Sequence, residues 1–144
     1  MLSGGRRPSN TKIMATIYNN GQKLFVVKLV IYPYDVMIYF GKNQEPLYKE
    51  LSKYISSSEI QQLREKQITR GDSVMFNNGA SLIRMPNVPR SINDLATLNH
   101  EVFHVVFFIL QEIGIKLVPQ SDEAFAYLIE YINKEIYKKI SISF

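Results

Sequence analysis

The sequence predicts a single α+β domain, in which N-terminal β-hairpins form a small antiparallel sheet and two long antiparallel helices follow. Two Asn-Gly turns, at residues 20–21 and 78–79, each separate two β-rich segments. Apolar residues then recur with a helical period over residues 92–113, and again after residue 121. Hairpins followed by helices indicate that the two kinds of element are segregated along the chain, which is typical of the α+β class.

Five β-rich segments are expected to form the hairpins. They cover residues 12–18, 23–32, 35–40, 73–76 and 80–84. Asn and Gly both tolerate positive φ, so the Asn-Gly pairs favour tight hairpins between the first two segments and between the last two. The first three segments are expected to pair as an antiparallel sheet. Pro86 and Pro89 then break the pairing and lead into the first long helix.

Two short helices are expected between the third and fourth of these segments. The first begins near Pro46 and carries Leu47, Leu51 and Tyr54 on one face. The second is expected over residues 58–66, because Ser58 and Gln61 have the spacing of a capping box.

The long helix over residues 92–113 has both of its ends marked. Ser91 and Asp94 are spaced as a capping box at its start, and Gly114 supplies a C-terminal stop. A helical wheel places seven apolar residues on one side: Leu95, Leu98, Val102, Val106, Ile109, Leu110 and Ile113. The opposite side is therefore expected to face a cleft or a second layer.

That opposite side carries the only two histidines of the chain, His100 and His104, with Glu101 between them. Side chains four residues apart share one face of a helix, so both imidazoles can reach one metal ion, and the glutamate can reach a water on that ion. This His-Glu-x-x-His arrangement is that of zinc peptidases. The alternative interpretation is a pair of histidines satisfied by hydrogen bonds within a helix interface.

A catalytic zinc usually has three protein ligands and one open position. Because the chain has no cysteine and no third histidine, the third ligand is expected to be a carboxylate. The second long helix, expected from Ser121 toward Lys139 and antiparallel to the first, offers Glu123, with Asp122 and Glu130 as alternatives. Acids in a first helical turn are also common simply because they complement the helix dipole.

Composition limits the remaining classes. A chain of 144 residues, 46% hydrophobic and 21% charged, suits one domain over residues 11–144, preceded by a flexible basic arm over residues 1–10. The absence of cysteine excludes disulfides and thiolate metal sites and agrees with a reducing compartment. A net charge of +4 is the only support for nucleic-acid binding, since no recognised motif accompanies it.

Targeting signals are not evident either. Residues 1–10 lack the apolar core of a signal peptide, and the longest apolar run, residues 105–110, is too short to cross a bilayer. A cytoplasmic protein without a membrane partner is therefore expected.

Over residues 92–133 the chain resembles a known group of enzymes. The segments that carry the resemblance are Leu98-Asn99-His100-Glu101-Val102-Phe103-His104, Gly114-Ile115 and Asp122-Glu123-Ala124-Phe125-Ala126-Tyr127-Leu128. They look like the gluzincins, the thermolysin-type zinc peptidases, and most closely like small metallopeptidases encoded by tailed bacteriophages and prophages. Gluzincins often have an aspartate where this chain has Tyr127, so hydrogen-bond support for a histidine would come from another residue.

The resemblance implies a minimal zincin-like fold and a zinc-dependent endopeptidase in a host-cell cytoplasm or a phage particle, acting on peptides or proteins, with phage virion proteins as further partners. It implies that His100, His104 and Glu123 hold Zn²⁺ and that Glu101 is the general base. Tyr127 would donate a hydrogen bond to the oxyanion, although packing in a helix interface is the alternative. Residues 80–84 would form the edge strand that aligns a peptide.

A second reading of the same resemblance is a zincin-like component of a phage particle or complex that binds or supports other proteins without catalysis. Its small size motivates this alternative, because little of the chain remains for the second lobe of a peptidase cleft.

Overall fold

A computed structural model describes residues 17–19 and 22–140, with only the backbone described for residues 17–19. Its elements follow one another in the order β1 (Ile17–Asn19), β2 (Gln22–Lys28), β3 (Asp35–Phe40), α1 (Glu45–Leu51), α2 (Ser57–Glu65), β4 (Asp72–Met75), β5 (Ser81–Met85), α3 (Ile92–Glu112), a short 3-10 turn (Pro119–Ser121) and α4 (Asp122–Ile140). The α+β class predicted from the sequence is confirmed. The predicted basic arm, the start of the first predicted strand and the first Asn-Gly turn lie outside the described residues.

The sheet has five strands in the order β1-β2-β3-β5-β4. The first three strands pair antiparallel, as predicted, with Asn19 opposite Gln22 and Lys28 opposite Asp35. The β4–β5 hairpin is also as predicted, but β5 pairs parallel to β3, from Val36 opposite Ser81 onward. The two predicted hairpin units are thereby joined into one mixed sheet.

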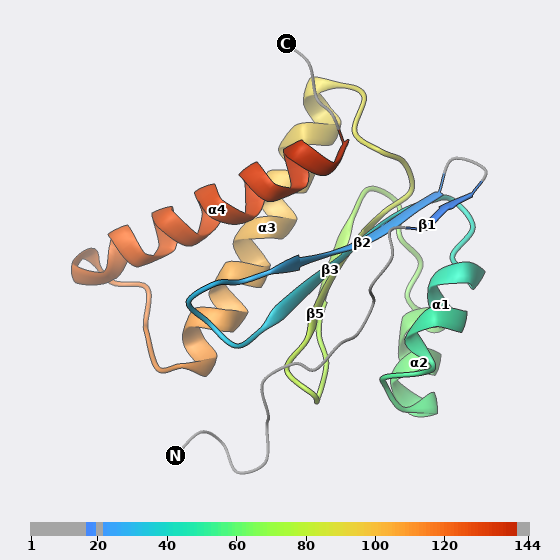
Figure 1. Ribbon diagram of the computed structural model, residues 1–144, viewed down its shortest axis with the longest axis horizontal. Coiled ribbons are helices and arrows are strands. Elements are labelled where there is room, and N and C mark those ends of the chain that lie inside the picture. The colour runs from blue at the N-terminus through green and yellow to red at the C-terminus, as the bar shows by residue number, and fades with distance from the viewer. Residues whose placement is uncertain (1–16, 20–21, 141–144) are drawn as a thin grey trace.

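Helices cover both faces of this sheet, with α3 and α4 on one side and α1 and α2 on the other (Figure 1). Strand β3 is buried along its whole length, and its alternate side chains enter two separate cores. Val36, Ile38 and Phe40 join the core beneath α3 and α4, whereas Met37 and Tyr39 join the core beneath α1 and α2. A central strand that is covered on both faces explains this continuous apolar run.

The short helices begin and end slightly earlier than predicted. Helix α2 starts at Ser57, and its capping box uses Ser56 and Glu59, not Ser58 and Gln61. The Glu59 carboxylate accepts from the Ser56 backbone N–H at 3.2 Å. Of two overlapping Ser-x-x-acid-or-amide patterns, the chain therefore uses the one that comes first. Tyr54 lies beyond α1, which ends at Leu51.

Helix α3 matches its prediction closely. The Ser91 hydroxyl accepts from the Asp94 N–H at 3.1 Å, and the Asp94 carboxylate accepts from the Arg90 N–H, so half of the expected capping box is formed. Gly114 follows the helix with φ +87°, a conformation that side chains disfavour. Five of the seven predicted core residues are buried: Leu98, Val102, Val106, Ile109 and Leu110.

Helix α4 runs antiparallel to α3. Near one end of the pair, the Tyr137 hydroxyl donates to Asn99 Oδ1 at 2.8 Å. Near the other end, the rings of Phe107 and Phe125 lie 6.5 Å apart. The predicted start at Ser121 falls in the preceding 3-10 turn, where its hydroxyl accepts from the Val118 N–H. Among the described residues, no helix is long and apolar enough to cross a bilayer.

Candidate metal and catalytic site

His100 and His104, the histidine pair, project from one face of α3 on successive turns. Their Nε2 atoms lie 3.1 Å apart, and the ring planes meet at 77°. Two nitrogens bound tetrahedrally to one zinc at about 2.0–2.1 Å would be about 3.3 Å apart. The pair is therefore spaced to share a metal ion with little movement of either ring.

The helix places both rings away from the core, as the helical wheel predicted. Val102 and Val106 are buried on the core side, while His100 is exposed and His104 is half-buried. Phe108 flanks the histidine pair, because its ring stacks on the His104 ring with the two centroids 6.4 Å apart. One exposed and one half-buried histidine, flanked by an aromatic side chain, remain accessible to solvent and to a ligand.

The short distance within the histidine pair has a second physical explanation. A neutral ring with its proton on Nε2 can donate a hydrogen bond to an unprotonated Nε2 of the other ring. Metal binding requires both nitrogens to be free of protons, so the ion and this hydrogen bond exclude each other. Metal binding itself is the observation that separates the two explanations.

Glu101 lies on the neighbouring flank of α3 and is 8% exposed. Its side chain packs against Gly71 at the start of β4, where an added Cβ would come within 3.3 Å of Glu101 Cγ. Among residues 22–140 the Glu101 carboxylate has no hydrogen-bond or ion-pair partner. A largely buried but uncommitted carboxylate beside two imidazoles is suited to accepting a proton.

A hollow of about 280 Å³ opens between α3 and the ends of β4 and β5. Thr97, one turn before Glu101, lines it together with Arg70 and Asn87. Thr97 also packs against Gly71, since a Cβ there would lie 2.9 Å from Thr97 Cγ2. The flank of α3 that carries Glu101 therefore adjoins an open space next to the sheet.

The edge strand beside this hollow is β4, which corrects one prediction. Residues 80–84 were expected at the edge, but β5 pairs with β3 on one side and with β4 on the other. Arg84 in β5 is completely buried. Because β5 pairs parallel to β3, β5 is an inner strand of the sheet. The edge of the sheet is formed by β4 instead.

The three acids of α4 that were predicted as candidate ligands, Asp122, Glu123 and Glu130, are all exposed. None of them has a hydrogen-bond or ion-pair partner within the described part of the chain. In that same part, no three His, Cys, Asp or Glu side chains are grouped closely enough to hold a metal. The structure thus brings the two histidines together and leaves the predicted ligand Glu123 outside that group.

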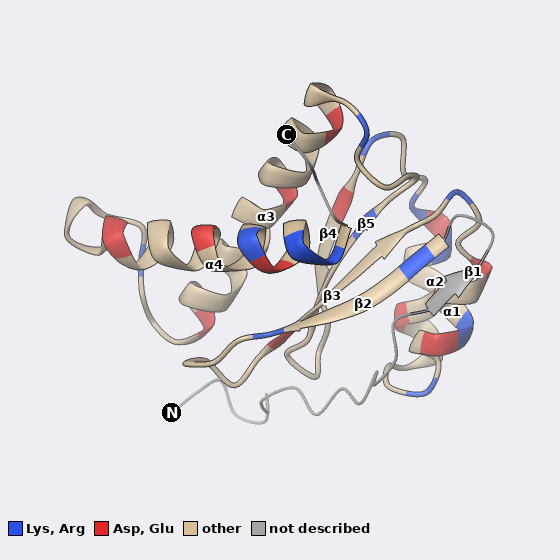
Figure 2. Ribbon diagram, turned by 45° about the horizontal axis from the view of Figure 1, so that its top comes forward, with Lys and Arg blue, Asp and Glu red and all other residues tan. Residues whose placement is uncertain are grey.

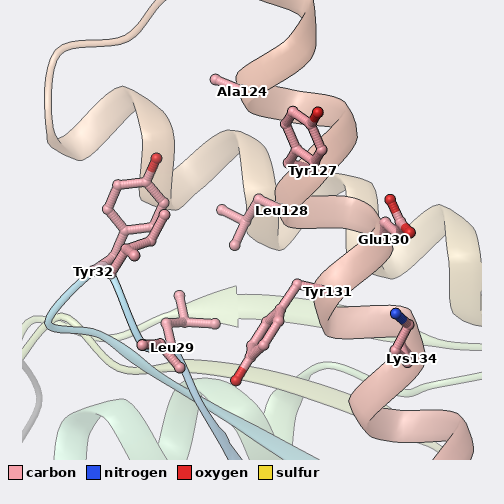
Figure 3. A pocket seen from close by; sticks show the side chains of 10 residues that line it. Leu29, Tyr32, Ala124, Tyr127, Leu128, Glu130, Tyr131 and Lys134 are labelled. Atoms are coloured by element: carbon pink, nitrogen blue, oxygen red, sulfur yellow. The ribbon is translucent and has the colours of Figure 1, made fainter.

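Tyr127 lies in a different place from the histidine pair. Its ring is 67% exposed and lines a groove of about 500 Å³ between α4 and the connection from β2 to β3. Leu29 and Tyr32 form the opposite wall of this groove, and neither histidine lines it (Figure 3). The structure therefore associates Tyr127 with this apolar groove.

A buried charged cluster on the other face of the sheet was not predicted. The Arg84 guanidinium donates to the Asp72 carboxylate at 3.0 Å, to the Tyr48 hydroxyl, and to the carbonyls of Leu63 and Lys66. Asp72 also pairs with Lys66 at 2.6 Å. This cluster ties the start of the edge strand β4 to α1 and α2. The only signal for this cluster in the sequence was Arg84, which lies at an inward position of the strand expected over residues 80–84.

The charges elsewhere are mixed. Figure 2 shows acidic and basic residues interspersed along α4 and over α1 and α2. Such a surface is typical of solvated proteins in general, and it adds nothing to the argument from net charge for nucleic-acid binding.

The side chains on these two helices are of the kinds that bind zinc. The two imidazole nitrogens have suitable spacing, and three uncommitted carboxylates lie on the adjacent helix. In comparisons with known proteins, the chain matches no family model, and no curated protein or solved structure is significantly similar to it.

Proposed function

We propose that the protein is a zinc-dependent peptidase. The observation that supports this most directly is the 3.1 Å separation of the Nε2 atoms of His100 and His104 on an exposed helix face. The uncommitted Glu101 carboxylate on the adjoining flank supports it further. Together these residues supply the two imidazoles and the carboxylate that the chemistry of the His-Glu-x-x-His motif requires.

His100 and His104 would each give one nitrogen ligand, and an acid from α4 would give the third. Zinc bound there would polarise a substrate carbonyl and make a water molecule more acidic. Glu101 would accept the proton of the attacking water and then deliver it to the amine that leaves. The burial of most of Glu101 restricts its motion, which would keep its carboxylate in range of both.

The substrates would be peptides or proteins. By the same resemblance to phage-encoded enzymes, the site of action would be a host-cell cytoplasm or a phage particle, and phage virion proteins would be partners.

Two measurements test this proposal in order. Protein purified without added metal should contain close to one equivalent of zinc, and His100→Ala or His104→Ala should lose it. Glu101→Gln should keep the metal and abolish hydrolysis of a peptide library. A wild-type protein that binds no divalent ion would refute the proposal, and a fully active Glu101→Gln would remove Glu101 from its role.

One observation favours a second candidate, a zincin-like binding or structural component without catalysis. No group of three potential ligands is assembled among residues 22–140. This candidate predicts that the wild-type protein hydrolyses no peptide in the library even when loaded with zinc, and that Glu101→Gln is indistinguishable from it.

A further inference from the structure

The apolar groove between α4 and the β2–β3 connection is held together by direct contacts between its two walls. Leu29 and Leu128 both line it, and both are buried in the core beneath α3 and α4. The Tyr131 hydroxyl donates to the Lys28 carbonyl at 2.9 Å, which ties α4 to the end of β2. Figure 3 shows Leu128 and Tyr131 pointing from α4 toward Tyr32 and Leu29. The groove of about 500 Å³ is therefore a fixed feature of the fold.

The most exposed apolar side chains of the described residues gather at this groove. Val30, Ile31 and Tyr127 are 84%, 77% and 67% exposed, and all three line it. Within residues 22–140 only Ile92, at the start of α3, is comparably exposed. Single exposed apolar residues are ordinary on a protein surface, but a contiguous group of them marks a binding surface. Tyrosine is also enriched in protein–protein interfaces.

The groove is also lined by one acid and one base, Glu130 and Lys134, and both are exposed. They lie four residues apart, so they share one face of α4. This spacing allows an ion pair within the helix, yet neither side chain has a hydrogen-bond or ion-pair partner in the described part of the chain. The groove thus presents one uncommitted charge of each sign, one helical turn apart.

A twofold axis makes this arrangement complementary to itself. In a twofold dimer the same surface of both subunits meets, so every contact between two different residues occurs twice. Two α4 helices that pack antiparallel, with the axis level with Ile132, place Glu130 of each subunit opposite Lys134 of the partner subunit. Both charges are then paired, whereas a ligand with a single charge would leave one of them unpaired. The same contact covers the exposed apolar side chains of both subunits.

We propose that the apolar groove and the side chains around it form the interface of a homodimer with twofold symmetry. Val30, Ile31 and Tyr127 supply its apolar centre, and Glu130 and Lys134 supply a polar rim, which is the usual composition of a protein–protein interface. Neither histidine lines the groove, so the inference does not depend on the proposed function.

The first test compares two matched variants, Ile31→Asp and Ile92→Asp. Both isoleucines are largely exposed, so each substitution adds the same charge at little cost to folding, but only Ile31 lines the groove. Sedimentation velocity over a range of protein concentrations measures the dissociation constant of the dimer, and circular dichroism shows that the variants are folded. EDTA is present, so that a metal ion shared by the histidine pairs of two molecules cannot link them.

We expect the wild type to dimerise reversibly and Ile31→Asp to weaken the dimer by about 100-fold or more, because a twofold dimer loses the apolar contact twice. Ile92→Asp should match the wild type. A wild type that stays monomeric, a dimer that dissociates when EDTA is added, equal losses in both variants, or no loss in Ile31→Asp would overturn the proposal. If the wild type is monomeric and binds the apolar dye bis-ANS, but Ile31→Asp does not, the groove is assigned to a small apolar ligand instead.

Charge reversal tests the twofold geometry. Glu130→Lys and Lys134→Glu should each weaken the dimer by about 10-fold at low ionic strength, because either one places like charges opposite each other twice. The double variant Glu130→Lys/Lys134→Glu restores both pairs with their signs exchanged, so its dissociation constant should return to within about threefold of the wild-type value. Losses that add in the double variant would contradict the pairing of Glu130 with Lys134 across the axis.

Discussion

Gly71 lies against Glu101, and the contact leaves no space for a side chain at position 71. A Cβ added there would come within 2.9 Å of Thr97 Cγ2 and 3.3 Å of Glu101 Cγ. The start of the edge strand β4 can approach α3 this closely only because residue 71 is glycine. The backbone of β4 and the proposed general base are therefore coupled by direct packing.

Gly71→Ala should separate these two elements. We expect the free energy of unfolding to fall by about 1 to 3 kcal/mol, because the added methyl group overpacks the contact. Under the proposed function, peptide hydrolysis should fall while zinc content is unchanged, since the histidine pair does not contact Gly71. Urea unfolding, metal analysis and a peptidase assay measure the three quantities.

A second substitution provides the control for this prediction. Thr97→Ser removes the Cγ2 methyl that is nearest to the added Cβ. The double variant Gly71→Ala/Thr97→Ser should therefore recover most of the lost stability, whereas Thr97→Ser alone should be nearly neutral. Equal stability of the single and double glycine variants would show that the contact with Thr97 is not the cause.

The Arg84–Asp72 pair should be a major determinant of stability. Arg84 is fully buried, and the Asp72 side chain is only 3% exposed. Arg84→Met leaves a buried carboxylate with Lys66 alone, and removing one partner of a buried pair typically costs about 3 to 5 kcal/mol. The double variant Arg84→Met/Asp72→Asn should lose less than the sum of the single losses, because neither charge is left unpaired. Additive losses in urea unfolding would contradict this coupling.

Tyr39 should make the fold sensitive to alkaline pH. Burial, followed by the nearby Tyr48, raises the pKa of Tyr39 from 10.0 to about 12. A pKa that is higher in the folded state contributes stability below pH 10, and this contribution is lost as pH rises from 10 to about 12. The loss should reach about 2 to 3 kcal/mol, since two pKa units correspond to about 2.7 kcal/mol.

Tyr39→Phe isolates this effect. The variant lacks the hydrogen bond from the Tyr39 hydroxyl to the Asn43 carbonyl, so its stability at neutral pH should be lower by about 1 kcal/mol. Its decline between pH 10 and 12 should be shallower than that of the wild type. Parallel declines in the urea-derived free energy would exclude Tyr39 as the titrating group.

The fold could be predicted where local rules determine it. The Asn-Gly turn at residues 78–79 specifies the β4–β5 hairpin, and apolar spacing with a serine cap and Gly114 specifies α3. The parallel pairing of β3 with β5 could not be predicted, because a strand's apolar pattern does not identify its neighbour. Only the apolar run over residues 36–40 of β3 indicated a central strand that is buried on both faces.

For the candidate site, too, only the part that local geometry determines could be predicted from the sequence. The convergence of His100 and His104 follows from helix geometry alone, so it could be predicted from their spacing. The position of the third ligand depends on how α3 and α4 are placed along each other. That placement is set by long-range contacts such as Phe107 with Phe125, for which the sequence has no local signal.

Tyr127 provides the last prediction. The family resemblance assigns it an oxyanion hydrogen bond, but its ring lines the apolar groove with Leu29 and Tyr32. We therefore expect Tyr127→Phe to keep kcat within about twofold of the wild type, whereas loss of an oxyanion donor typically lowers kcat about 100-fold or more. Because the ring is 67% exposed, the substitution should also leave stability almost unchanged. A large fall in kcat with an unchanged KM would place the hydroxyl at the reacting carbonyl, and α4 would then have to move when substrate binds.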